Sequence, residues 1–131
     1  MSELDEAKAF FIKDRYAMFT TGIDILDVGP KYAKCIMNIE EKHLNVAGTV
    51  MGGAVFTLAD FCFAVASNFK QGHAVSVNSQ INFFRPGTGK YLVAESDLVK
   101  DGKTIINYNI NVKDDQERLV AVVNITGMRL G

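Results

Sequence analysis

The chain has 131 residues, of which 48% are hydrophobic and 22% are charged, and its formal net charge is -1 at pH 7. This length is enough for one domain with a single hydrophobic core, covering residues 1–131. A net charge so close to zero predicts no basic surface and therefore no nucleic-acid partner. Because Cys35 and Cys62 belong to no spaced cysteine motif, we expect neither a disulfide framework nor a zinc site.

The sequence contains no feature that predicts contact with a membrane. Its first residues, Met1 to Lys8, are acidic and lack the apolar region of a signal peptide. The longest apolar stretch, residues 54–66, is interrupted by Thr57 and Asp60, and a membrane span needs about 20 apolar residues. Cysteines that behave as small core hydrophobes fit a reducing compartment, so we expect a cytoplasmic protein without a membrane partner.

The first elements in chain order are one helix and two strands. Ser2 and Asp5 match a capping box, which predicts a helix that begins there and ends at Gly22. Residues 23–28 predict a short strand that leads into a Gly-Pro turn. Residues 32–40 alternate between apolar and polar side chains, which is the pattern of a half-buried strand.

A loop, an apolar helix and four further strands follow. The loop is expected at residues 43–51, the helix at 53–69, and the strands at 75–83, 92–98, 106–112 and 119–129. One apolar helix beside about six half-buried strands predicts an α+β fold in which the sheet curls around the helix. The helix is too apolar to be covered by one small sheet, so part of its surface should contact a second subunit.

Asp60 is the most informative residue, because almost all its neighbours in the predicted helix are hydrophobic. Burial of an unpaired carboxylate is costly or raises its pKa, so Asp60 should face a cleft or have dedicated partners. Gly52 and Gly53 open the same helix, where free N–H groups and the helix dipole favour negative charge. Hydrogen-bond donors at a helix N-terminus and an acid two turns further on predict acyl chemistry.

The order of elements and the string HLNVAGTVMGGAVFTLAD, residues 43–60, resemble the hotdog-fold acyl-CoA thioesterases, most closely the phenylacetate-pathway type. The family's pattern is an asparagine, a stretch ending in His-Gly-Gly, and then Leu-Ala-Asp. The matching residues of this chain are Asn45, Gly52, Gly53, Leu58, Ala59 and Asp60. Residues 83–87, FFRPG, also resemble the strand end that follows the helix in this family. The resemblance implies a curled antiparallel sheet of about six strands around one long helix, and an acyl-CoA substrate without a cofactor.

The chain departs from this pattern at Met51, which stands where the family has a histidine before the two glycines. The resemblance implies that this histidine orders the site around the asparagine, and a methionine cannot donate or accept hydrogen bonds comparably. We expect Met51 and Gly53 to line the substrate site. Arg85 and Lys90 are candidates for contact with the phosphates of coenzyme A.

Each candidate catalytic residue has a definite expected role. The Gly52 N–H group would stabilise the oxyanion, and Asp60 would act as general base on water or as nucleophile. Asn45 would hold the water or the substrate carbonyl group. The resemblance places a water-orienting polar residue at Ser76.

The spacing of two of these residues predicts a homo-oligomer. Gly52 and Asp60 are eight residues apart in the sequence, which is about 12 Å along a helix axis. Both therefore cannot touch the same carbonyl group. If both act, Asp60 must come from a two-fold-related helix, with two sites at the interface of a dimer, alone or within a dimer of dimers.

Each of these residues is also compatible with a role outside catalysis. The two glycines can form a tight turn only, Asp60 can be a structural carboxylate at a dimer seam, and Ser76 and Arg85 can be solvated surface residues. One alternative function is a non-catalytic module that binds acyl-CoA. Another is an acyl-thioester dehydratase or hydratase, which needs a histidine paired with an acid, and neither His43 nor His73 lies at the predicted helix mouth.

Overall fold

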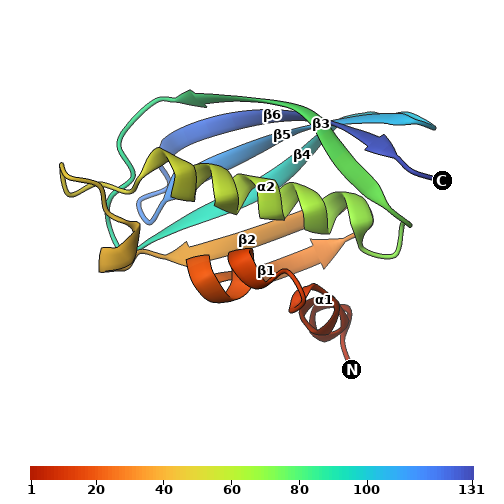
Figure 1. The fold of residues 1–131 in the computed structure, drawn as a ribbon, viewed down its shortest axis with the longest axis horizontal. Helices are drawn as coiled ribbons and strands as arrows, with labels where there is room; N and C mark the ends of the chain where they lie inside the picture. Colours follow the sequence, from red (N-terminus) through yellow and green to blue (C-terminus); the bar gives the residue numbers. More distant parts are fainter.

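The computed structural model describes residues 1–131 and consists of a six-stranded antiparallel sheet wrapped around one long helix (Figure 1). The helix is α2, Gly52–Asn68. The strands are β1 (Ile23–Gly29), β2 (Tyr32–Asn38), β3 (Ala74–Phe83), β4 (Tyr91–Asp101), β5 (Ile105–Asp114) and β6 (Leu119–Arg129). Their order in the sheet is β1-β2-β4-β5-β6-β3. The predicted hotdog arrangement is therefore confirmed.

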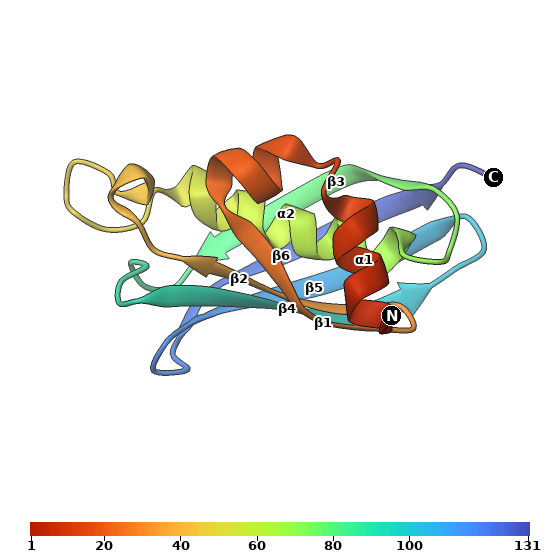
Figure 2. The same ribbon diagram turned by 90° about the horizontal axis from the view of Figure 1, so that it is seen from below.

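The prediction of one continuous N-terminal helix is wrong. Helix α1 covers only Glu3–Phe11, and a separate π-helical segment, Tyr16–Thr21, follows it. The capping box itself is confirmed, because the Asp5 N–H group donates to Ser2 Oγ at 3.1 Å. The turn between the two segments, at residues 12–15, places α1 against β1 and the π-helical segment against α2, and Ala17 is buried in the core. Figure 2 shows the π-helical segment beside α2, on the same side of the sheet.

The core lies between α2 and the sheet, as the period-two pattern predicts. Alternate residues of β2 are fully buried against the helix, as are the helix residues that face them: Ala33, Cys35, Met37, Leu58, Ala59 and Cys62. Both cysteines are free thiols inside this core. None of the helices combines the length and the apolar content that crossing a bilayer requires.

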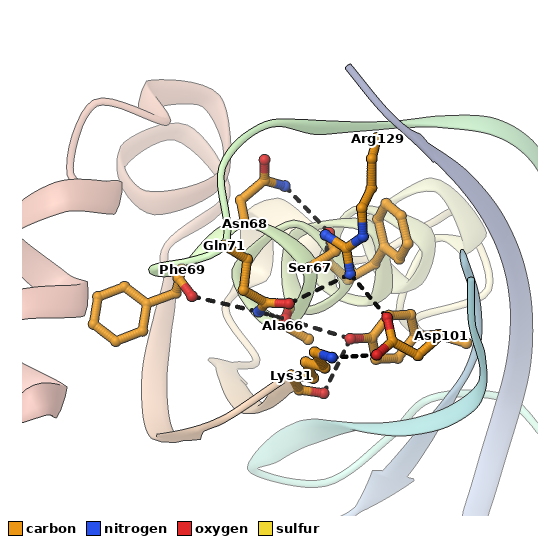
Figure 3. Close-up of polar contacts among 10 residues, drawn as sticks. Lys31, Ala66, Ser67, Asn68, Phe69, Gln71, Asp101 and Arg129 are labelled. Atoms are coloured by element: carbon orange, nitrogen blue, oxygen red, sulfur yellow. Dashed lines mark hydrogen bonds and ion pairs between the residues drawn. The ribbon is translucent and has the colours of Figure 1, made fainter. Parts of the chain in front are cut away.

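A polar cluster fixes the C-terminal end of α2 to three strand ends (Figure 3). Asp101, at the end of β4, pairs with Lys31 and accepts a hydrogen bond from Arg129 Nη2 at 3.1 Å. Gln71 lies beyond α2 and donates to the Ala66 carbonyl group at 2.6 Å. The hydrogen bond from Lys31, and then that from Arg129, lowers the pKa of Asp101. Arg129 Nη2 also donates to Gln71 Oε1 at 3.5 Å, so the cluster connects the end of α2 to the sheet.

Strand β3 forms a free edge of the sheet, because it pairs only with β6. Most of its residues are exposed, among them Val75, Val77 and Phe83. An unpaired edge with exposed apolar side chains is a template for pairing with another chain. The opposite edge, β1, is covered in part by α1, which packs against it.

Asp114 supports the turn between β5 and β6, and its side chain is fully buried. Its carboxylate accepts hydrogen bonds from the N–H groups of Gln116 at 3.0 Å and Arg118 at 2.9 Å, and from Arg118 Nε at 2.8 Å. Burial raises the pKa of Asp114, but the hydrogen bonds from the Arg118 and Gln116 backbone and the Arg118 side chain outweigh it, so the net shift is downward. The ionised form is therefore the stabilising one.

We expect Asp114→Ala to lower the free energy of unfolding by about 2–3 kcal/mol at pH 7, because the partly buried N–H groups of Gln116 and Arg118 lose a charged acceptor. Urea unfolding measures this change, with the exposed Gln116→Ala as a control that keeps the carboxylate. A carboxyl group with a lowered native pKa stabilises above its unfolded value, 3.8, and loses this effect as the pH falls through the native value. The difference between wild type and Asp114→Ala should therefore shrink below about pH 4; a difference constant down to pH 2 would contradict this role of the ionised carboxylate.

Candidate functional site

The N-terminus of α2 is held by a closed loop at residues 43–51. The Met51 N–H group donates to the His43 carbonyl at 2.8 Å, and the Asn45 N–H group donates to the Thr49 carbonyl at 2.8 Å. Ala54 and Val55 both donate to the Met51 carbonyl group. The first N–H groups of a helix have no intrahelical acceptor. The N–H groups of Gly52 and Gly53 accordingly remain free for an external acceptor.

His43 is a structural residue of this loop. It is only 4% exposed, and its Nδ1 accepts from the Glu40 N–H group at 2.9 Å. Its Nε2 lies 2.7 Å from the Thr21 carbonyl oxygen, and must donate to it, because a carbonyl oxygen only accepts. Both ring nitrogens are thus occupied, and His43 joins the loop to the end of the π-helical segment. It has no free nitrogen with which to act as an acid or a base.

Asn45 shapes the same loop with its side chain. Its Oδ1 accepts from the N–H groups of Ala47 at 3.0 Å and Thr49 at 3.1 Å. Its Nδ2 donates to Thr49 Oγ1 at 3.1 Å. Since an amide nitrogen carries two hydrogens, Asn45 retains one donor that is exposed to solvent.

Asp60 lies half-buried in a cleft of about 350 Å³ between α2 and the N-terminal segment. Its neighbours on the same face of α2 are Thr57 and Ala64, and the opposite wall is formed by Lys13, Asp14, Arg15, Tyr16 and Ala17. The Asp60 carboxylate has no hydrogen-bond or ion-pair partner in the chain. Burial raises the pKa of Asp60, and the negative charge of Asp14 raises it further. Of the two alternatives expected for Asp60, a cleft or dedicated partners, the structure shows the cleft.

Gly52 lies in a different hollow, of about 460 Å³, at the mouth of the helix. Phe83 and Arg85 line this hollow together with Gly52. A Cβ atom on Gly52 would lie 3.0 Å from Phe83 Cζ, so the ring packs against the glycine. The linings of this hollow and of the Asp60 cleft have no residue in common.

The other predicted site residues lie apart from both hollows. Met51 is exposed at the N-terminal boundary of α2 and makes no side-chain cap. Gly53 is exposed at the start of the helix face that carries the half-buried Thr57 and Asp60. Ser76 is exposed on β3, and Lys90 precedes β4. In one chain, therefore, Gly52 and Arg85 are the only two predicted residues that line the same hollow.

The residues that sequence reasoning missed are those at 13–17. Nothing in their pattern indicated that they reach Asp60, because the apolar periodicity from Phe11 to Met18 is compatible with one helix. The only local signal is the charged triplet Lys13-Asp14-Arg15 after three apolar residues. Charged side chains at positions where a continuous helix would pack against the core indicate that a turn interrupts the helix.

The sequence is similar to proteins of one family. A family model described as the thioesterase superfamily matches residues 47–121, which is more than half of the chain. The acyl-coenzyme A thioesterase PaaI of Escherichia coli K12 is 33% identical over 111 residues, which cover 84% of this chain and 79% of that protein. A putative esterase of Deinococcus radiodurans is 37% identical over 97 residues, or 73% of this chain and 66% of that protein.

The fold leads to the same family. The structure of E. coli PaaI matches with a TM-score of 0.87 and 30% identity, covering 99% of this chain and 97% of that chain. The protein smu.793 of Streptococcus mutans, solved bound to acetyl CoA, matches with a TM-score of 0.77 and 26% identity, covering 83% and 89%. The chain therefore belongs to the thioesterase superfamily: it is a hotdog-fold protein of the thioester hydrolase class.

Proposed function

We propose that this protein hydrolyses acyl-CoA thioesters at sites formed between two copies of the chain. The observation that carries the proposal is the unpartnered Asp60 carboxylate, half-buried in its cleft with a raised pKa. A raised pKa makes an ionised carboxylate a stronger base. The relative named acyl-coenzyme A thioesterase and the neighbouring structure with acetyl CoA support the substrate class.

The proposed reaction uses Asp60 and the free N–H group of Gly52. Asp60 removes a proton from water, and the water oxygen forms a bond to the thioester carbon. The Gly52 N–H group stabilises the oxyanion of the tetrahedral intermediate, aided by the helix dipole. The C–S bond then breaks, and the proton held by Asp60 passes to the departing sulfur. In the alternative mechanism, the Asp60 carboxylate acts as a nucleophile and attacks the thioester carbon, and the C–S bond breaks. Water then hydrolyses the resulting anhydride.

A second copy of the chain is required because Gly52 and Asp60 line separate hollows within one chain. The exposed edge strand β3, with the apolar side chains of Val75, Val77 and Phe83, is the surface through which we propose that two chains associate. A two-fold axis there would bring Asp60 of one chain towards Gly52 of the other and create two equivalent sites. The assembly would be a dimer or a dimer of dimers.

The remaining predicted residues have proposed supporting roles. Asn45 would donate its free amide N–H to the water or to the substrate carbonyl, and Ser76 would orient the water in the assembled site. Met51 and Gly53 would line the acyl group at the helix mouth. Arg85 makes no ion pair in the chain and lies in the Gly52 hollow, so its guanidinium would be available to a phosphate of coenzyme A.

A hydrolysis assay with short-chain, medium-chain and aromatic acyl-CoAs tests the proposal. Thiol release with a thiol reagent should show turnover of at least one of these classes. Isothermal titration with the same acyl-CoAs and a non-hydrolysable thioether analogue measures binding separately. Binding of the analogue without turnover of any acyl-CoA would reject the enzyme and support the non-catalytic binding module, which the replacement of the family histidine by Met51 favours.

We expect Met51→His to raise the rate of hydrolysis by roughly two- to tenfold. An imidazole at the helix mouth could hydrogen-bond to the loop that carries Asn45, and one ordered hydrogen bond contributes about 0.5–1.5 kcal/mol. Steady-state kinetics on both proteins checks this. Met51→Leu is the control, because leucine has about the size of methionine and cannot form the hydrogen bond expected of the histidine. An unchanged kcat with a higher KM in the histidine variant would instead identify Met51 as a wall of the acyl pocket.

A further inference from the structure

The turn between α1 and the π-helical segment is fixed against α2 close to Asp60. The Asp14 N–H group donates to the Phe11 carbonyl at 2.8 Å, and the Met18 N–H group donates to the Asp14 carbonyl at 3.0 Å. The buried Phe11 ring packs edge-on against the Phe61 ring, with 6.0 Å between centroids. Phe61 is the residue after Asp60, so this packing sets where the turn lies relative to the Asp60 carboxylate.

The charges around Asp60 come from this turn. Lys13, Asp14 and Arg15, with the phenol of Tyr16, are the titratable groups of the opposite wall of the cleft. The Lys13 ammonium group lies over the Phe10 ring, 6.0 Å from its centroid, and neither Lys13 nor Arg15 forms an ion pair with either carboxylate. The titratable groups of the core side of α2 are the thiols Cys35 and Cys62 and the phenol Tyr108, all fully buried on the face towards the sheet.

We infer that Asp14 is a positioning residue for thioester hydrolysis, whose exposed carboxylate, on the turn that forms one wall of the Asp60 cleft, makes Asp60 a stronger base and ties the reaction to pH. This inference rests on the function proposed above. Two carboxylates in one cleft disfavour the ionisation of each other. Burial comes first and the charge of Asp14 second among the causes that raise the pKa of Asp60, while burial raises the pKa of Asp14.

The direction of the pH effect follows from the charge. Removal of the Asp14 charge stabilises ionised Asp60 and lowers its pKa. At low pH, kcat/KM falls because the base becomes protonated. This acid limb of the pH profile should then move to lower pH. At higher pH the variant should be slower than wild type, because a base of lower pKa accepts a proton from water less readily.

The test compares Asp14→Asn with Asp97→Asn in the whole 131-residue chain. Asp97 is exposed on β4 and has no hydrogen-bond or ion-pair partner, so it provides the same loss of charge away from the cleft. Carbon-13 NMR titration of the Asp60 carboxyl group, and the pH profile of kcat/KM, should both show a midpoint at lower pH in Asp14→Asn. Both should be unchanged in Asp97→Asn and in Asp14→Glu, which keeps the charge on the turn.

An Asp60 midpoint in Asp14→Asn equal to that of wild type would overturn the inference. So would a lower rate in this variant with an unmoved acid limb, because that result describes a purely structural role. The NMR measurement needs no activity, so it decides the inference even if the protein hydrolyses none of the acyl-CoAs. If Asp14→Asn does not fold, a salt titration of the wild-type Asp60 midpoint replaces it: salt screens the repulsion between partly exposed carboxylates, and a midpoint unaffected by salt would also overturn the inference.

Discussion

Replacing Asp60 by asparagine is expected to lower kcat for acyl-CoA hydrolysis about 100-fold or more while the fold is retained, because removal of a general base costs this much in rate. The amide has nearly the same shape as the carboxylate, and Asp60 has no partner in the chain that the change would leave unpaired. Steady-state kinetics and circular dichroism on the two proteins measure both effects. A folded variant that hydrolyses an acyl-CoA at the wild-type rate would show that Asp60 is not the catalytic residue.

The same substitution should raise the free energy of unfolding at neutral pH. Burial, and then Asp14, raises the pKa of native Asp60 above the unfolded value of 3.8, so the native state binds more protons than the unfolded state between the two values. Stability contributed by this group is therefore lost as the pH rises through the native pKa. A neutral amide avoids that loss, which is the usual trade between stability and activity at catalytic positions.

Urea unfolding at pH 7 and pH 3 checks the sign of this effect. Asp60→Asn should exceed wild type in stability at pH 7, and the difference should disappear at pH 3, where the carboxyl group is protonated in both states. Asp97→Asn, on the exposed outer side of β4, serves as the control for a simple change of net charge. Lower stability of Asp60→Asn at pH 7 would instead identify Asp60 as a satisfied structural carboxylate.

The strands could be predicted from the sequence because period-two alternation depends only on which face of a strand is buried. The predicted helix at 53–69 and the strands agree with α2 and β1–β6 to within three residues at each end. The strand order could not be predicted, because β3 precedes β4 in the chain but lies at the far edge of the sheet beside β6. That placement arises from long-range pairing, which local periodicity does not encode.

The site was predictable only in part for a similar reason. Gly52 and Asp60 stand out locally, since glycines at a helix mouth and an acid in an apolar helix are visible in a short window. The cleft around Asp60 is not visible in this way, because Asp14 reaches it from a turn inside what the sequence presents as one helix. Likewise, the lone His43 gives no sign in the sequence that both its ring nitrogens are bound, to Glu40 and to Thr21.

Two inactive variants should restore activity when their subunits are mixed, if each site combines Asp60 of one chain with Gly52 of the other. The pair is Asp60→Asn and Gly52→Pro. Proline removes the Gly52 N–H group and is tolerated at the first position of a helix. Met51 has φ -58 and ψ 137, close to the polyproline II conformation that a residue before proline tolerates. The proline variant should therefore fold and lack only the oxyanion donor.

Random exchange of equal amounts of the two variants gives dimers of which half are mixed. Each mixed dimer has one site with both functional groups and one with neither, so about one quarter of the wild-type activity should return. Gly52→Ala is the matched control for bulk, because it adds the Cβ that faces Phe83 and keeps the N–H group. The exposed Phe83 ring can move away from this Cβ, so Gly52→Ala should retain far more activity than Gly52→Pro.

The subunits are exchanged by co-refolding from urea, native mass spectrometry verifies that mixed dimers have formed, and light scattering verifies that the mixture contains dimers or larger assemblies. If the activity after verified exchange equals only the sum of the activities of the two separate variants, Gly52 and Asp60 do not act together in one site. A stable and active wild-type monomer at micromolar concentration would exclude the shared site directly. Recovery of activity on mixing has no explanation within one chain, because Gly52 and Asp60 line separate hollows there and neither variant alone holds both groups.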